Sequence, residues 1–106
     1  MSDTIDRLTA VIGERRVSDP ALSYVAKLSA RGRAKIAQKV GEEAVETIIA
    51  AMAGDREGVI GESADLIFHL AVLLADMDLT LADVLSELDR RDGVSGLVEK
   101  AARLPE

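Results

Sequence analysis

The stretch ADLIFHLAVLLA, residues 64–75, decides the fold of this 106-residue chain. From Leu66 to Ala75 only His69 is polar, so a helix over these residues has no side suited to water. A helix that is apolar all round is buried all round. Because a bundle of a few short helices cannot easily enclose one of its own members, we expect a second subunit to cover this helix, most simply in a two-fold dimer.

Helical patterns also fill the rest of the chain. Apolar residues recur at helical spacing, and proline or glycine breaks separate the segments. The predicted helices are residues 3–14, 21–30, 33–53, 56–76 and about 80–91, with a last helical turn or two at 97–103. No segment alternates with the period of a strand. We therefore predict a single all-α domain over residues 1–106. It is a helical bundle built around a long antiparallel hairpin (33–53 and 56–76) and completed by a second subunit.

Composition excludes several classes of protein. The chain has no cysteine and one histidine, which rules out disulfides, thiolate metal sites and a histidine-rich zinc site within one chain. A net charge of −6 argues against a nucleic-acid binder. The N-terminus lacks a signal-peptide pattern, and no uninterrupted apolar run reaches the ~18 residues of a membrane span. We expect a cytoplasmic protein that binds neither nucleic acid nor membrane.

Charge is distributed unevenly along the chain. Residues 1–41 carry eight Lys/Arg and four Asp/Glu, whereas residues 42–106 carry five and fifteen. Solvated helix faces are the commoner cause of such asymmetry. A site in which basic residues hold a polyanion and carboxylates hold a metal would produce the same asymmetry.

The segment GEEAVE, residues 41–46, puts three acids on the polar side of the 33–53 helix. On a helical projection, Glu42, Glu43 and Glu46 share one face with Lys35 and Lys39, and apolar residues fill the remaining arc. Taken alone, this is the pattern of a solvent-exposed helix face, on which Lys39 and Glu43 form an i,i+4 pair.

The hairpin brings a second set of acids to the first. Glu46 and Glu62 are each eight residues from Gly54, and Glu43 and Asp65 are each eleven. At ~1.5 Å per residue, antiparallel helices place the inner pair ~12 Å and the outer pair ~16 Å from the turn, so four carboxylates converge. Such acids repel unless a counter-charge is present, and an all-oxygen set suits Mg²⁺, with Mn²⁺ as the alternative, rather than zinc. Acidic helices facing each other through water remain the other interpretation.

The order and spacing of these acids resemble those of a known family. GEEAVE followed by ESAD (62–65) is similar to the E-E-x-x-E … E-x-x-D motif of the all-α MazG-type nucleotide pyrophosphohydrolases. Nearly the whole chain resembles one branch, the phosphoribosyl-ATP pyrophosphatases of histidine biosynthesis. The matching segments are SY at 23–24, KIAQKVGEEAVE at 35–46, ADLIFHLAVLL at 64–74 and SGLVEKAAR at 95–103. One position departs from the pattern, since Val25 stands where the family commonly has threonine.

The resemblance implies Mg²⁺-dependent hydrolysis of phosphoribosyl-ATP, a small-molecule nucleotide, to phosphoribosyl-AMP and pyrophosphate by a helical homodimer. It implies that the metal ligands are Glu43, Glu46, Glu62 and Asp65, and that Glu42, Glu43 and Glu46 are catalytic. Glu42 is either a further ligand or the carboxylate that orients the attacking water. Lys39, on the same face, could reach a phosphate oxygen.

Three other residues have both functional and structural interpretations. His69 lies four residues after Asp65, and we interpret it as a buried partner that orients this acid, with proton transfer as the alternative. Arg15 is a candidate phosphate ligand or a cation favoured by the end of its helix. Tyr24 is a candidate for stacking on a base or for simple packing.

Two other functions stay open. A house-cleaning nucleoside triphosphate pyrophosphohydrolase would use the same carboxylates on another substrate, although the SY and SGLVEK segments favour phosphoribosyl-ATP. A catalytically inert helical dimerisation module would tolerate replacement of its acids and would not respond to a divalent metal.

Overall fold

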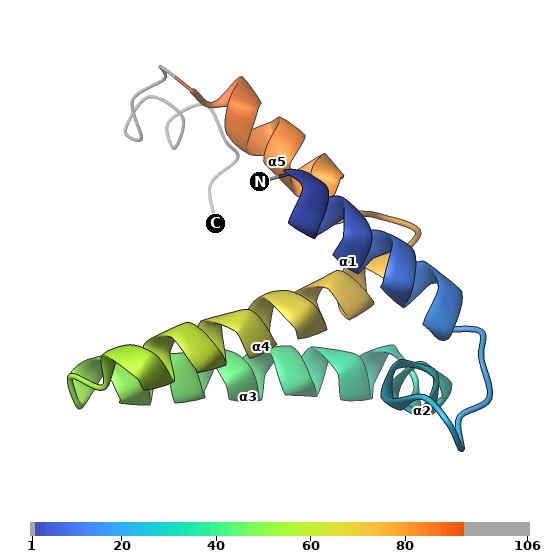
Figure 1. Cartoon of the computed structure of the whole chain (residues 1–106), viewed down its shortest axis with the longest axis horizontal. Coiled ribbons are helices and arrows are strands. Elements are labelled where there is room, and N and C mark those ends of the chain that lie inside the picture. Colours follow the sequence, from blue (N-terminus) through green and yellow to red (C-terminus); the bar gives the residue numbers. More distant parts are fainter. Residues whose placement is uncertain (1, 93–106) are drawn as a thin grey trace.

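A computed structural model describes residues 2–92, and within them every regular element is a helix. The helices are α1 (Ser2–Arg15), α2 (Tyr24–Arg31), α3 (Arg33–Met52), α4 (Arg56–Asp76) and α5 (Leu81–Arg90), as Figure 1 shows. The predicted all-α fold is confirmed for this part of the chain. The expected helical turns at 97–103 lie outside the described residues.

Local sequence explains where the helices begin and end. Ser23 caps α2 by accepting a hydrogen bond from the Ala26 amide, so the helix starts three residues later than predicted. Gly32 ends α2 with a φ of 97°, a conformation that favours glycine. At α5, Thr80 and Asp83 bond reciprocally to each other's amides and form a capping box.

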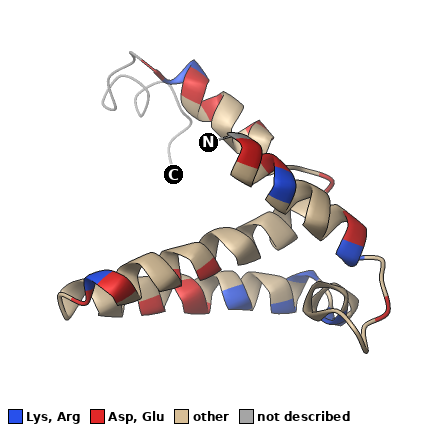
Figure 2. Ribbon diagram, viewed as in Figure 1, with Lys and Arg blue, Asp and Glu red and all other residues tan. Residues whose placement is uncertain are grey.

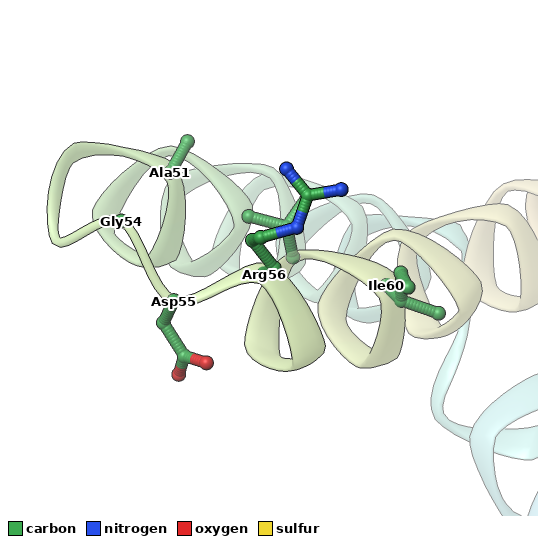
Figure 3. Close-up of a pocket in the computed structure, with 6 residues that line it drawn as sticks. Ala51, Gly54, Asp55, Arg56 and Ile60 are labelled. Atoms are coloured by element: carbon green, nitrogen blue, oxygen red, sulfur yellow. The ribbon is translucent and has the colours of Figure 1, made fainter.

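The two longest helices form an antiparallel hairpin. Residues 53–55 connect α3 to α4, and the two helices lie side by side along their length (Figure 1). Asp55 caps α4 through a 3.0 Å hydrogen bond from the Gly58 amide, and its side chain points away from that of Arg56 at the turn (Figure 3). At the open end, Arg33 Nε lies 2.6 Å from the Asp76 carboxylate and ties the start of α3 to the end of α4.

The hydrophobic core sits at the open end of the hairpin. Every described helix contributes to it, and its buried members are Ile12, Val25, Leu28, Ile36, Ala71, Val72 and Leu81. Val25, at the position where the resemblance leads one to expect threonine, is therefore a packing residue here. The half of the hairpin near the turn projects away from α1, α2 and α5 (Figure 1).

This projecting half is oriented in an unexpected way. Glu43, on the polar side of α3, is buried with 7% of its surface exposed, because that side faces α4. The apolar side of α3 faces outward instead. Exposed apolar side chains on the two helices are Val45, Ile48, Ile49, Met52, Ile60 and Ile67, with exposures from 44% to 84%. Within one chain, the hairpin thus buries Glu43 and leaves its apolar side open.

Length and average apolarity alone would let α4, among the described helices, cross a membrane. We expected no such segment, because no uninterrupted apolar run in the sequence reaches the ~18 residues of a membrane span. The core helix of a soluble protein passes the same test, so the observation is weak evidence. Glu62 and Asp65 of this helix lie against acids of α3, and ionised carboxylates in lipid are costly.

Candidate active site

Carboxylates of α3 and α4 meet midway along the hairpin. One oxygen each from Glu43, Glu62 and Asp65 lie within 4.8 Å of one another. Figure 2 shows the acidic positions of the two helices side by side at this level. The two i,i+3 pairs predicted to converge therefore do face each other across the hairpin, with three of the four acids in close contact.

Glu46 is not one of these three acids, but it interacts with both Glu43 and Glu62. Burial raises the pKa of Glu43, and the neighbouring Glu46 and Asp65 carboxylates raise it further. Burial likewise raises the pKa of Glu62, followed by the repulsion of Glu46 and Glu43. Glu43 and Glu62 are thus harder to ionise than free carboxylic acids, which is the behaviour of a site that lacks enough positive charge.

The donor set fits a divalent cation. Glu43 Oε2 is buried and has no hydrogen-bond partner among residues 2–92. Buried polar atoms nearly always have a hydrogen-bond partner or a ligand, so this unsatisfied oxygen indicates that a ligand binds here. Three carboxylates from two helices supply hard oxygen donors of the kind that Mg²⁺ and Mn²⁺ prefer.

Glu42 has different surroundings from the other acids. Its carboxylate accepts a 2.8 Å hydrogen bond from Gln38 Nε2 and lies 3.3 Å from Lys39 Nζ. The bond from Gln38 lowers the pKa of Glu42, and Lys39 lowers it further. In turn, the hydrogen bond to Glu42 raises the pKa of Lys39. Glu42 is therefore kept ionised and Lys39 is kept positively charged.

The contacts of Glu42 bear on its two expected roles, which are a further metal ligand and the carboxylate that orients the attacking water. The described geometry leaves it out of the group of three that could share one ion. Lys39 is 4.0 Å from Glu43 Oε1, so it stands between Glu42 and the buried acid. A hollow of about 630 Å³ opens over this face of α3, lined by Lys39, Glu42, Glu43 and Glu46 among others.

His69 has a different bond to Asp65 from the one expected. It is 6% exposed, and its Nδ1 lies 2.8 Å from the backbone carbonyl of Asp65 rather than from the carboxylate. Its Nε2 lies 2.9 Å from the Tyr24 hydroxyl. Since a carbonyl only accepts, Nδ1 carries the hydrogen, and in the tautomer protonated at Nδ1 alone the hydroxyl of Tyr24 donates to Nε2. Both ring nitrogens are thus occupied by the protein.

Tyr24 and Arg15 line a separate hollow of about 510 Å³. It is formed by the end of α1, the connection to α2, and Phe68 of α4. The Tyr24 ring is half exposed and stacks on Phe68 at a centroid distance of 6.3 Å. Arg15 is not among the residues around the acids, so the structure does not bring this candidate phosphate ligand to the acid cluster.

A third hollow, at the hairpin turn, is lined by different residues from those of the acid cluster. Its volume is about 460 Å³, and Ala51, Gly54, Arg56 and Ile60 line it (Figure 3). None of the candidate active-site acids contributes to its lining. It belongs to the open apolar side of the hairpin rather than to the acid cluster.

Sequence reasoning missed two contacts. Gln38 lies four residues before Glu42, and this spacing on a helix is a signal that could have identified it. The bond between Tyr24 and His69 joins residues 45 positions apart, and no local pattern indicates it.

Comparison with known proteins gives a consistent result. Residues 5–92 match the family described as phosphoribosyl-ATP pyrophosphohydrolase. The chain is 66% identical over 103 residues to a phosphoribosyl-ATP pyrophosphatase of Rhizorhabdus wittichii, covering 97% of both chains. It is 62% identical over 101 residues to that of Novosphingobium aromaticivorans, covering 95% of this chain and 94% of the relative. With the enzyme of the same name from Zymomonas mobilis, identity is 59% over the same coverages.

Proposed function

The chain belongs to the phosphoribosyl-ATP pyrophosphohydrolase family, and on this basis we propose that it hydrolyses phosphoribosyl-ATP in histidine biosynthesis. In this reaction water breaks the phosphoanhydride bond between the α- and β-phosphates. The products are phosphoribosyl-AMP and pyrophosphate. The observation that carries the proposal is the buried, unpartnered oxygen of Glu43, facing two carboxylates of α4 on the same hairpin.

Glu43, Glu62 and Asp65 would hold a divalent cation, Mg²⁺ or Mn²⁺, and Glu46 would complete the set from one turn along α3. Such a cation would neutralise oxygens of the triphosphate and polarise the bond to be broken. The protein contributes rigidity. Because the acids project from two packed helices rather than from loops, their separation is set by the hairpin itself.

Glu42 and Lys39, which lie next to each other, have complementary roles at the reacting phosphate in this proposal. Glu42 stays ionised, so it can accept a hydrogen bond from the attacking water and point that water's lone pair at phosphorus. Lys39 stays protonated and offers up to three donors to phosphate oxygens. Gln38 fixes the Glu42 carboxylate and so sets the direction from which water approaches.

We further propose that the active form is a homodimer located in the cytoplasm. The exposed apolar side chains of α3 and α4 support a dimer, because a contiguous apolar surface of this kind is the mark of a protein interface. A second copy of the hairpin would cover Ile48, Ile49 and Ile60 and complete the bundle around α4. Sedimentation at micromolar concentration tests this: a dimer is expected, and a stable monomer would contradict it.

The experiment that tests the function measures pyrophosphate release from phosphoribosyl-ATP and from common nucleoside triphosphates, with and without Mg²⁺. We expect release from phosphoribosyl-ATP that is lost in excess chelator and restored by Mg²⁺. Glu43→Gln should abolish most of this activity. Glu57→Gln, an exposed acid in the first turn of α4, is the matched control and should behave as the unmodified protein.

Thermal unfolding makes the test independent of turnover. A ligand at a hundred times its dissociation constant stabilises the folded state by about 2.7 kcal/mol. Mg²⁺ should therefore raise the melting temperature of the unmodified protein and of Glu57→Gln, but not that of Glu43→Gln. Full turnover in chelator would remove the metal from the proposal. Comparable kcat/KM values for ordinary nucleoside triphosphates would replace the proposed substrate by a house-cleaning role.

A further inference from the structure

A basic groove lies between α2 and α3, next to the acid cluster. Its volume is about 220 Å³, and Lys27, Arg31, Lys35 and Lys39 line it together with Tyr24 and Glu42. Four cations thus share one hollow with a single acid. Figure 2 shows basic positions of α3 between the acids at mid-hairpin and the end where α2 packs. Of our sequence-based candidates, Lys39, Tyr24 and Glu42 line this groove, whereas Lys27 and Arg31 were not singled out.

The four cations converge because of the way the two helices meet. Lys27 and Arg31 are four residues apart on α2, and so are Lys35 and Lys39 on α3, so each pair shares a helix face. Gly32, in its positive-φ conformation, turns the chain between the two pairs. Like charges placed close together repel one another, so this cluster of cations is unfavourable unless an anion binds to it.

Three of these cations have no ion pair with a described residue. Lys39 is paired with Glu42, but no carboxylate within residues 2–92 pairs with Lys27, Arg31 or Lys35. Elsewhere among the described residues, Arg33, Arg90 and Arg91 each have an acidic partner, whereas no carboxylate of residues 2–92 pairs with Arg7, Arg15, Arg16 or Arg56. What distinguishes the groove is that four cations gather in one concave surface with a single acid, Glu42, on which both Lys39 and Lys35 act. Such an excess of positive charge in a hollow suits a polyanion.

The groove is continuous with the candidate active site. Lys39 and Glu42 line both the groove and the larger hollow that contains Glu43 and Glu46. Along α3, Lys35 precedes Glu43 by eight residues, which corresponds to about 12 Å. A ligand that spans both hollows would have one anionic end on the acid cluster with its metal and another among the four cations.

We propose that the groove binds the phosphate of the phosphoribosyl group while the triphosphate lies at the acid cluster. This inference rests on the proposed function, because phosphoribosyl-ATP differs from ATP in carrying a second phosphorylated sugar. A phosphate monoester bears a charge of about −1.5 to −2 at pH 7, and Arg and Lys are its usual partners. Lys27, Arg31 and Lys35 would then determine specificity, since an ordinary nucleoside triphosphate has nothing to place in the groove.

The test uses Lys27→Gln, Arg31→Gln and Lys35→Gln in the full-length protein with Mg²⁺. Each variant should raise KM for phosphoribosyl-ATP about tenfold, which corresponds to about 1.4 kcal/mol, and leave kcat within about a factor of two. The inhibition constant of pyrophosphate, which occupies only the metal end, should stay unchanged. Arg31→Lys keeps the charge and should retain most of the affinity. Arg7→Gln, an exposed cation on α1, is the matched control and should change nothing.

Each outcome has a definite meaning. If KM and the pyrophosphate inhibition constant rise together, the cations bind the triphosphate end, and the inference is wrong. It is also wrong if KM stays unchanged in variants that melt like the unmodified protein. Failure of the unmodified protein to release pyrophosphate from phosphoribosyl-ATP would instead refute the proposed function, so the two failures are distinguishable.

Discussion

Tyr24→Phe removes one oxygen atom and tests how the acidic helix is held to α2. The Tyr24 hydroxyl lies 2.9 Å from Nε2 of His69, whose Nδ1 faces the Asp65 carbonyl at 2.8 Å. The substitution keeps the aromatic ring and its stacking on Phe68. What it removes is the hydrogen-bond donor for a histidine that is 6% exposed.

The expected loss follows from this geometry. A buried acceptor left without a partner costs about 1–3 kcal/mol. The Tyr24 ring is 50% exposed, so water can approach the vacated position and the cost should fall at the low end, near 1 kcal/mol. For a domain of this size, 1 kcal/mol corresponds to a melting temperature lower by roughly 4–8 °C.

The assay is equilibrium unfolding in urea at fixed protein concentration, because an oligomer's stability depends on concentration. A double-mutant cycle with His69→Gln isolates the pair, and the coupling energy should be at least about 0.5 kcal/mol. If Tyr24→Phe unfolds within about 0.3 kcal/mol of the unmodified protein, or if the two substitutions are additive, the hydroxyl does not partner His69. An Nε2-protonated ring, seen by nitrogen NMR, would refute the assigned tautomer.

Three further predictions concern single carboxylates. Asp55→Ala should lower the free energy of unfolding by about 1 kcal/mol in thermal or urea denaturation, because the side chain caps α4 through an amide three residues on. Glu87 has a pKa lowered to about 2 by hydrogen bonds from two neighbouring arginines. Its stabilisation should be complete above pH 4.5 and disappear as pH falls toward 2, so the difference between the protein and Glu87→Gln should vanish on acid titration. Glu46→Gln and Asp65→Asn should each abolish most activity, with a double variant little worse than either, and should hold or raise stability without metal. Near-normal turnover in both single variants would contradict a shared site.

Much of the fold could be predicted from the sequence because its determinants are local. The bounds of α4 are those predicted, since Gly54 stops one helix and Asp55 caps the next within three residues. The start of α2 was harder to predict from the sequence. Pro20 marks a break, but only the structure shows that Ser23, rather than an earlier residue, accepts the capping hydrogen bond.

The meeting of the acids could be predicted for a related reason. Two straight helices joined by a short turn keep constant register, so counting residues from Gly54 is enough to bring Glu43 level with Asp65. The same counting could not tell which side of α3 faces α4. A polar face usually meets solvent, and here Glu43 of that face is buried against α4 while Glu42 and Glu46 stay exposed.

The basic groove depends on the one quantity that counting does not provide, the angle between consecutive helices. Lys27 and Arg31 could have pointed away from Lys35 and Lys39, and the backbone of Gly32 decides that they do not. The sequence shows only that cations are in excess up to residue 41 and acids after it. It does not show which of these cations share a groove. In the folded hairpin, that boundary falls within α3, where Lys39 and Glu42 are in contact. A substrate with phosphates at both ends would lie across this boundary. If the groove binds the free phosphate as proposed, the charge asymmetry of the chain reflects the opposite surroundings that the two ends of one ligand need: cations for the free phosphate, and carboxylates that would hold a metal for the bond that is broken.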